Sequence, residues 1–230
     1  MPLRRRRSDF QLSIQIPPEC PSFVADSAFR EIASVRVYGR NATIVRQGDV
    51  VRCAYILRRG LVQVTSLMPN GKSFMDLMGP GGVFGVPWML AGQPHGFGLS
   101  ALDECEFDQA EAPRFLEYLE ENPAAVLELM RWLCRQEIQI VKHMLLLTVR
   151  VPSSERLLSA LIELGRVYGA PVESGVRIQV PLTIQMLADK IGCSRQWASK
   201  LMGELEAAGK LMRNGSWITL INGAGRSGRP

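Results

Sequence analysis

The chain has 230 residues, of which 47% are hydrophobic and 21% are charged. These proportions are typical of a folded globular protein and exclude a disordered chain. The formal net charge of +5 is unevenly placed, because residues 151–230 hold ten lysines and arginines against six aspartates and glutamates. This excess favours a polyanion partner for the C-terminal third, and a scattered surface imbalance explains it equally well.

The sequence also argues against membrane, secreted and enzymatic classes. Residues 1–21 contain the run Arg4–Arg7 but no apolar stretch of a secretory signal, and no segment offers the ~20 apolar residues of a membrane span. Five scattered cysteines indicate reduced thiols, so we expect a cytoplasmic protein. CxxC, HExxH, GxSxG and P-loop motifs are all missing, and an enzyme is therefore not expected.

Residues 1–21 are predicted to be a basic flexible tail, either a solubilising arm or a contact for DNA or acidic membrane. Residues 22–121 follow as a domain in which short apolar stretches alternate with glycine-centred turns. Asn70-Gly71 is a strong hairpin signal, and the regular spacing predicts a compact β-sandwich or barrel. The glycine-rich segment at 79–86 lacks the context of a dinucleotide-binding fingerprint, which leaves a ligand-approaching turn and a simple corner as equal alternatives.

Residues 122–150 are predicted to form one long helix, with Asn122 as its N-cap and Pro123 at its first position. Apolar residues spaced alternately by four and three positions are typical of a helix that pairs with a partner helix. Further apolar neighbours widen this face, so we expect the helix to serve its own domain as well. The predicted dimer-interface residues are Val126, Met130, Leu133, Glu137, Ile140, Met144 and Leu147.

Residues 151–230 carry the pattern of a winged helix-turn-helix. Thr183 is predicted to cap a short helix that ends near Gly192, and Ser194 to cap a second helix from Arg195 to about Ala208. A hairpin follows. Helix N-termini bind phosphates, and a recognition helix reads bases with its N-terminal residues. The predicted DNA contacts are Thr183, Ser194, Arg195, Gln196, Ser199, Lys200, Arg213 and Asn214.

The exposed side of the second helix suits base readout. Arg195 fits a bidentate contact with guanine O6 and N7, and Gln196 fits adenine N6 and N7. Lys200 can reach guanine or a phosphate, while the wing residues Arg213 and Asn214 are phosphate candidates. For Trp197, the helical spacing favours partial core packing over a base contact. A winged helix that makes only protein contacts is the alternative to DNA binding.

The stretch at 182–201, LTIQMLADKIGCSRQWASKL, resembles the DNA-binding motif of the CRP/FNR family of bacterial transcription regulators. RQGD at 46–49, YILRRG at 55–60 and GGVFG at 81–85 are similar to glycine landmarks of the family's cyclic-nucleotide-binding-type β-roll. The resemblance implies an α+β protein with an N-terminal double-stranded, jelly-roll-like β-roll sensor, a long dimerisation helix and a winged helix-turn-helix.

The same resemblance implies a homodimer on double-stranded DNA with palindromic half-sites, with its recognition helices in successive major grooves about 34 Å apart. RNA polymerase is a further candidate partner. Gln196 stands where the family commonly has glutamate, so the half-site is expected to differ from the family consensus at one base pair.

The chain departs from the family's known sensors. Val86 stands where the cAMP-binding branch has a glutamate, and His-Gly-Phe at 95–97 replaces the Arg-Ser pair that holds the cyclic phosphate. A cyclic phosphate would lack its charge partner, so cAMP is not expected. With Cys20 alone near the N-terminus, an iron–sulfur cluster is not expected either. The haem-binding branch's cysteine and histidine after the glycine-rich turn are also missing.

The side chains expected to line the β-roll pocket are apolar, which leaves an apolar small-molecule effector and a filled core without effector as open alternatives. Redox sensing by Cys105 or Cys134 is a less favoured hypothesis. The alternative function is a small-molecule, haem or redox sensor that acts through protein contacts. The predicted pocket residues are Phe74, Met75, Phe84, Val86, Trp88, Phe97, Met130, Cys134 and Val141.

Overall fold

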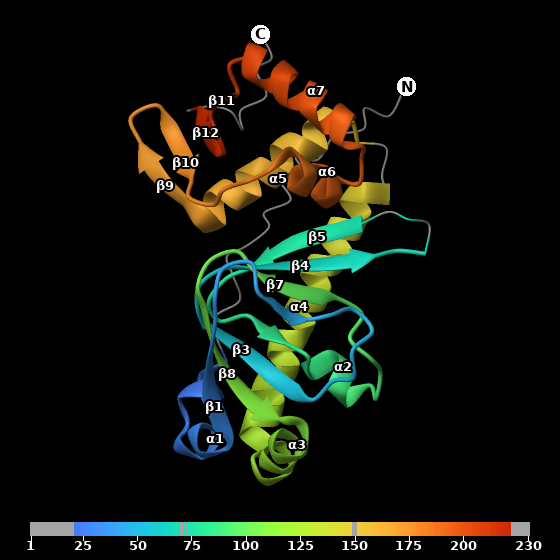
Figure 1. The fold of residues 1–230 in the computed structure, drawn as a ribbon, viewed down its shortest axis with the longest axis vertical. Coiled ribbons are helices and arrows are strands. Elements are labelled where there is room, and N and C mark those ends of the chain that lie inside the picture. Colours follow the sequence, from blue (N-terminus) through green and yellow to red (C-terminus); the bar gives the residue numbers. More distant parts are fainter. Residues whose placement is uncertain (1–20, 70, 72, 149–150, 222–230) are drawn as a thin grey trace, which may run out of the picture.

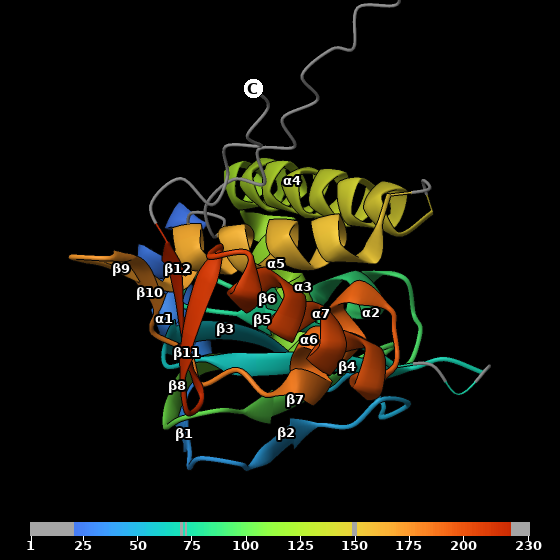
Figure 2. The ribbon, with the colours of Figure 1, turned by 90° about the horizontal axis from the view of Figure 1, so that it is seen from above.

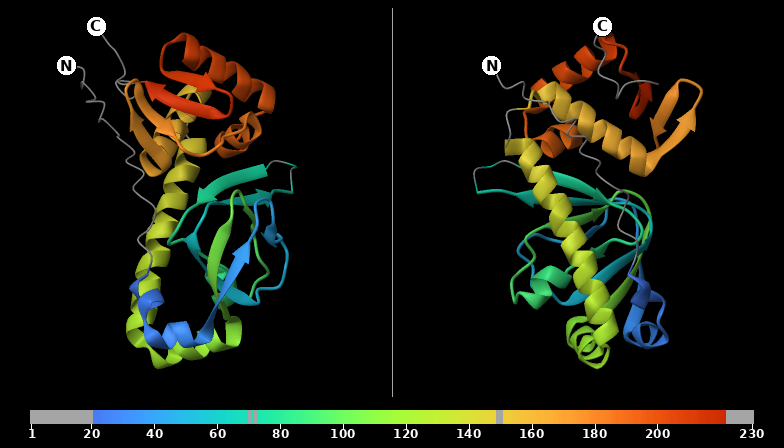
Figure 3. Two further views of the ribbon diagram at one scale, coloured as in Figure 1. Left: turned by 60° about the vertical axis from the view of Figure 1, so that its left-hand side comes forward. Right: turned by 180° about the vertical axis from the view of Figure 1, so that it is seen from behind.

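The computed structural model describes residues 21–69, 71, 73–148 and 151–221, and within helix α4 it leaves out the side chains of residues 139 and 142–148. A β-roll lies at one end of the molecule and a smaller helical domain with two hairpins at the other (Figure 1). The long helix α4 (Pro123–Thr148) runs along one side of the β-roll toward the second domain (Figure 3). The α+β class expected from the sequence is confirmed.

Two antiparallel four-stranded sheets make up the β-roll. The hairpin of β4 (Val62–Leu67) and β5 (Ser73–Met78) forms at the predicted place, with Leu67 opposite Ser73 and Gly71 at a φ of 75°. Asn70 of that predicted turn lies outside the described residues. In spatial order the first sheet contains β1 (Ala33–Tyr38), β8 (Cys105–Glu111), β3 (Cys53–Arg59) and β6 (Val83–Phe84), and the second contains β2 (Thr43–Val45), β7 (Gly98–Ala101), β4 (Val62–Leu67) and β5 (Ser73–Met78).

The glycine-rich segment at 79–86 turns a corner between β5 and the short helix α2 (Val86–Leu90). Gly85 has a φ of 90°, which L side chains rarely adopt, and an added Cβ would lie 2.7 Å from the backbone oxygen of Cys53. This position therefore requires glycine for packing alone, whatever else the segment binds.

Aromatic side chains close the end of the β-roll that is remote from the second domain. They come from η1 (Ser22–Ala25), α1 (Ser27–Ile32) and α3 (Ala112–Glu121), and Phe23, Phe29 and Phe115 are all buried. Glu128 of α4 accepts hydrogen bonds from the backbone N–H groups of Ser22, at 2.8 Å, and Phe23, at 3.0 Å. Helix α4 is thereby fixed to η1.

The second domain begins with α5 (Ser153–Tyr168) and adds two hairpins to the predicted helix-turn-helix. Its helices α6 (Ile184–Ile191) and α7 (Arg195–Ala207) lie where the sequence placed them. A four-stranded sheet in the order β11-β12-β10-β9 flanks them, and its β9–β10 hairpin was not predicted. Its strands are β9 (Gly169–Val172), β10 (Gly175–Ile178), β11 (Leu211–Asn214) and β12 (Trp217–Ile221).

One hydrophobic core cluster crosses the boundary between the two domains. Leu61 and Met75 of the β-roll pack with buried leucines of α5 and α6, including Leu161 and Leu187. Strand β5 and helix α6 are in contact at this boundary. The helix-turn-helix is therefore packed directly against the sensor-like domain as well as being joined to it through α4.

Candidate nucleic-acid interface

Helices α6 and α7 meet at the tight turn that the sequence predicted. Gly192 ends α6 in the left-handed conformation, with a φ of 69°. Ser194 caps α7 through a hydrogen bond from the Trp197 N–H to its hydroxyl oxygen at 3.2 Å, and the Thr183 hydroxyl accepts from the Met186 N–H at 3.1 Å. Both predicted DNA-contact hydroxyls are thus helix caps, and their contact with phosphate stays a prediction.

Helix α7 separates its buried and exposed faces as predicted. Its buried side chains are Ala198, Leu201, Met202 and Leu205. All four predicted readout residues of the helix are exposed near its N-terminus, namely Arg195, Gln196, Ser199 and Lys200. Figure 1 shows α7 and the β11–β12 hairpin at the end of the molecule that is farthest from α3, and Figure 2, seen from above, shows this end in front of the β-roll. A polar helix face with a free N-terminal end is therefore open to a large partner.

Trp197 does not show the partial core packing that its helical spacing favoured. Its side chain is 42% exposed and does not belong to the core cluster that α7 buries. The ammonium of Lys200 lies 5.0 Å from the centroid of its ring, and the same ammonium is 3.9 Å from the carboxylate of Glu204. The helical spacing misled here because position 197 lies at the edge of the buried face, where periodicity alone does not decide orientation.

The predicted phosphate contact Arg213 is engaged by an acidic partner. Its guanidinium Nη2 lies 2.6 Å from Oε2 of Glu206, its Nε donates to the same oxygen at 2.9 Å, and its backbone N–H donates to Oε1. The hydrogen bonds from Arg213 lower the pKa of Glu206, so the carboxylate is ionised at neutral pH. Asn214 is exposed beside Gly215 at the tip of the wing, as predicted.

The predicted effector pocket is not assembled as one site. Met75 belongs to the core at the domain boundary, whereas Phe84 and Val86 belong to two separate clusters of the β-roll. Phe97 contacts the rings of Phe74, at 5.8 Å, and Trp88, at 5.7 Å. Met130, Cys134 and Val141 lie exposed on α4. The prediction grouped these residues because they are apolar, but the fold distributes them among separate hydrophobic clusters and the exposed face of α4.

A cleft of about 490 Å³ lies elsewhere, between the β-roll and the wing. Of the residues that line it, only Asn214 was singled out from the sequence. It is lined by Arg40, Leu61, Leu102, Asp103, Gln179, Pro181, Asn214, Gly215, Ser216 and Trp217.

His95 occupies the place where the cAMP-binding branch is expected to hold phosphate. Its side chain is buried, it stacks on Phe84 with ring centroids 5.2 Å apart, and its Nδ1 has no hydrogen-bond partner in the described part of the chain. Burial lowers its pKa, against a smaller upward effect of Asp49. At neutral pH this position therefore offers a neutral ring and no cation for a cyclic phosphate.

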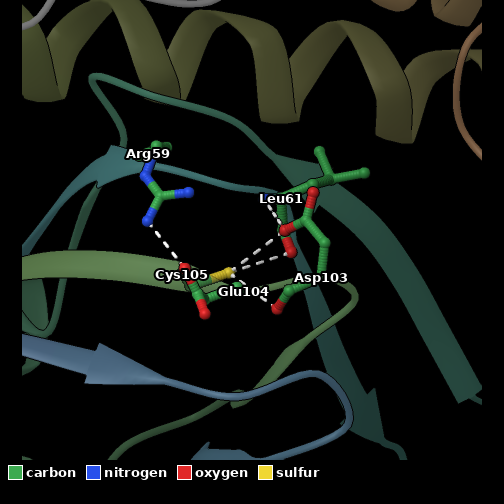
Figure 4. Close-up of polar contacts among 5 residues, drawn as sticks. All are labelled: Arg59, Leu61, Asp103, Glu104 and Cys105. Carbon is green, nitrogen blue, oxygen red and sulfur yellow. Dashed lines mark hydrogen bonds and ion pairs between the residues drawn. The ribbon is translucent and has the colours of Figure 1, made fainter.

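Cys105 is poorly suited to redox sensing. Figure 4 shows its thiol within hydrogen-bond distance of the Leu61 carbonyl, at 3.3 Å, and of the Asp103 carboxylate, at 3.5 Å. Burial, with the Asp103 carboxylate, raises its pKa to about 11. The reactive thiolate form is therefore scarce at neutral pH. The Asp103 carboxylate near this thiol also accepts a hydrogen bond from the Leu61 N–H at 2.6 Å.

The apolar seam of α4 is rotated from the predicted one. Val126 and Leu133 pack against the β-roll's own core. Met130, Glu137 and Ile140 are exposed, whereas the side chains of Met144 and Leu147 lie outside the described residues. Among the described side chains of α4, the large apolar ones that are exposed are Leu127, Met130, Ile138, Ile140 and Val141. Leu127, which was not predicted, is therefore exposed on α4, whereas the predicted Val126 packs against the β-roll.

Two broader properties hold for residues 21–69, 71, 73–148 and 151–221. No group of histidine, cysteine, aspartate or glutamate side chains there is arranged to hold a metal ion. None of the helices in these ranges combines the length and apolar character that crossing a bilayer requires.

Both domains match known protein families. Residues 35–122 match the cyclic nucleotide-binding domain, and residues 155–225 match the Crp-like helix-turn-helix domain. A global nitrogen regulator of Nostoc sp. is 29% identical over 188 residues, which are 78% of this chain and 84% of that protein.

Solved structures agree on the fold. The c-di-GMP-responsive global regulator CLP of Xanthomonas campestris superposes with a TM-score of 0.76 at 19% identity, over 85% of this chain and 97% of that one. FixK2 of Bradyrhizobium japonicum superposes with a TM-score of 0.70 at 21% identity, over 83% of this chain and 93% of that one. The two domain matches in this order, on this fold, show that the chain belongs to the CRP/FNR family of DNA-binding transcription regulators.

Proposed function

We propose that this regulator acts as a homodimer that places helix α7 of each subunit in the major groove of one palindromic DNA site. The observation that carries this proposal is the polar face at the N-terminal end of α7, opposite its buried face. A recognition helix reads base edges with residues at that end. The net positive charge of residues 151–230 adds attraction to the phosphate backbone.

The readout assigned to α7 follows from its side chains. Arg195 contacts guanine O6 and N7, and Gln196 contacts adenine N6 and N7. Lys200 reaches guanine or a phosphate from the next turn, and Ser199 lies between them. Thr183, Ser194 and Asn214 contact the backbone, which fixes the register of the protein on the duplex.

The dimer is proposed to form along the exposed apolar face of α4. Met130 is 56% exposed, and Leu127, Ile138, Ile140 and Val141 are similarly open to solvent in the single chain. Several large apolar side chains exposed along one long helix mark an interaction site, and the partner proposed here is a second copy of α4, paired as in a coiled coil. As part of the same proposal, RNA polymerase is the next partner and the cytoplasm is the location, in line with the role of a DNA-binding transcription regulator.

Regulation by an effector other than cAMP, or by none, is the proposal that fits the sensor domain. Neutral His95 and apolar Val86 stand where a cyclic phosphate and a ribose would need partners. The cleft between the β-roll and the wing is a second place where a small molecule could bias the position of the DNA-binding domain.

The test is selection of bound sites from a random duplex library, with the Arg195→Ala variant compared on the selected site. We expect a palindrome, and we expect Arg195→Ala to lose about 1–3 kcal/mol at one G·C pair in each half-site while other pairs keep their contributions. Arg114→Ala removes the same charge from α3, at the other end of the molecule, and serves as the control. Equal weakening on all sequences would contradict base readout by Arg195, and the absence of any selected site would contradict the proposed function.

A further inference from the structure

Trp197 is the one large hydrophobic side chain that the described part of α7 leaves exposed. It lies on the first turn of the helix, directly after Gln196 and one turn before Lys200. Exposing an indole ring to water is unfavourable, and the ring belongs to none of the hydrophobic clusters found among the described residues. Because the ring lies at the readout end of α7, it is positioned to contact the molecule that this helix binds.

The ring is held in place before any DNA arrives. The Lys200 ammonium lies 5.0 Å from the ring centroid, and the Glu204 carboxylate lies 3.9 Å from the same ammonium. A cation on an aromatic face limits the rotamers of both side chains. The Lys200 charge and the Trp197 ring thus lie next to each other on the exposed face of α7.

The major groove offers an apolar side chain one distinctive feature, which is the 5-methyl group of thymine. A phosphate contact at position 197 would be served by a hydroxyl or a cation, whereas indole has a single N–H donor and is otherwise apolar. We propose that Trp197 reads the methyl group of one thymine in each half-site, next to the base pair read by Gln196. This inference rests on the proposed function, because it requires α7 in the major groove.

The test removes that methyl group and nothing else. On the selected palindrome, each thymine is replaced in turn by deoxyuridine, symmetrically in both half-sites, and the affinity of the full-length dimer is measured. Burying one methyl group corresponds to about a fourfold gain, so we expect one symmetric pair of replacements to weaken binding about 15-fold and the others to have little effect.

Variants then assign the effect to Trp197. Trp197→Ala is expected to bind the thymine and deoxyuridine duplexes equally, and Trp197→Phe to keep part of the discrimination. The matched control is Trp217→Ala on β12, whose ring is 43% exposed and lies outside α7, and this variant should keep the full discrimination. Circular dichroism and sedimentation check that each variant folds and dimerises.

Two results would overturn the inference. Tolerance of deoxyuridine at every thymine by the wild type would show that no methyl group is read, and weaker binding by Trp197→Ala would then indicate a backbone contact. Discrimination that persists in Trp197→Ala would assign the methyl contact to another residue. Failure of the proposed function itself is distinguishable, because then no palindrome is selected at the outset.

Discussion

Lys190 of α6 and Asp76 of β5 form an ion pair that joins the DNA-binding domain to the β-roll, with Nζ and Oδ1 2.7 Å apart. The lysine is 1% exposed, and Glu163 of α5 lies 3.8 Å from the same ammonium. Burial lowers the pKa of Lys190, but the two carboxylates outweigh burial and the net direction is upward. The buried lysine is therefore charged and depends on its partners across the domain boundary.

Asp76→Asn should destabilise the protein by about 2 kcal/mol in urea unfolding. Removing one partner leaves a buried ammonium undercompensated, at a usual cost of ~3–5 kcal/mol, and water access to Asp76, whose side chain is 43% exposed, reduces that cost. The double variant Asp76→Asn with Lys190→Met should lose less than Asp76→Asn alone. A smaller loss for the single variant than for the double would contradict the pairing.

The exposed pair Arg59–Glu104 provides the matched comparison for that experiment. Its atoms are also only 2.8 Å apart (Figure 4), but each side chain is 61% exposed. Surface pairs of this kind contribute ~0–1 kcal/mol, so Glu104→Gln should change the free energy of unfolding far less than Asp76→Asn does.

His95 should make the β-roll less stable in mild acid. Its folded-state pKa lies below the ordinary 6.5 because of burial, so the unfolded chain binds the proton first as the pH falls. The stability contributed by the neutral ring is complete above about pH 6.5 and is lost as the pH falls below it. The groups that face the ring are Asp49, whose charge acts upward on this pKa, together with Tyr55 and Phe84.

His95→Phe isolates this effect, because phenylalanine can keep the stacking on Phe84 and does not titrate. Urea unfolding of both proteins at pH 7.5 and pH 5.5 should show a smaller loss for the variant. An identical loss in the two proteins would assign the acid sensitivity to other groups.

Glu206→Gln should strengthen DNA binding, given the proposed function. The substitution removes a negative charge from the wing and releases the Arg213 guanidinium, which Glu206 now binds at 2.6 Å. A freed cation that meets a phosphate steepens the salt dependence of log K by about one unit per subunit. Glu173→Gln, an equal charge change between β9 and β10, should leave the salt dependence unaltered. Weaker binding by Glu206→Gln would show that the ion pair itself shapes the wing for DNA.

Met130→Glu should convert the proposed dimer to monomers. The residue is 56% exposed on α4, so a glutamate there is harmless in the single chain but leaves a charge buried between paired helices. Leu67→Glu on β4, at a side chain that is 65% exposed, is the control and should remain dimeric in sedimentation equilibrium. Dimers of unchanged strength in Met130→Glu would place the interface elsewhere.

Features set by neighbouring residues were predictable from the sequence. Gly192 between α6 and α7, the Ser194 cap and the β4–β5 hairpin depend on local backbone geometry, and all lie where expected. The buried face of α7 was also predicted, because its apolar spacing matches a helix. These local signals are sufficient to predict the position of the candidate interface.

Features set by distant partners were not predictable. Both faces of α4 are apolar, and only packing against the β-roll shows that Val126 lies inside and Leu127 outside. Lys190 resembles a surface residue until Asp76, 114 positions away, is found beside it. The expected pocket residues are separated for the same reason, because contacts with distant elements decide where each one packs. Met75, for example, packs in the core at the domain boundary.

The spacing between half-sites tests the proposed dimer on DNA most directly. Equilibrium affinity should be measured for the selected palindrome and for versions with five or ten base pairs inserted at its centre. Two recognition helices held by paired α4 helices can reach only major grooves about 34 Å apart on one face of the duplex, so both insertions should reduce binding to the level of a single half-site. Affinity that is unchanged by either insertion would contradict a dimer that grips both half-sites at once.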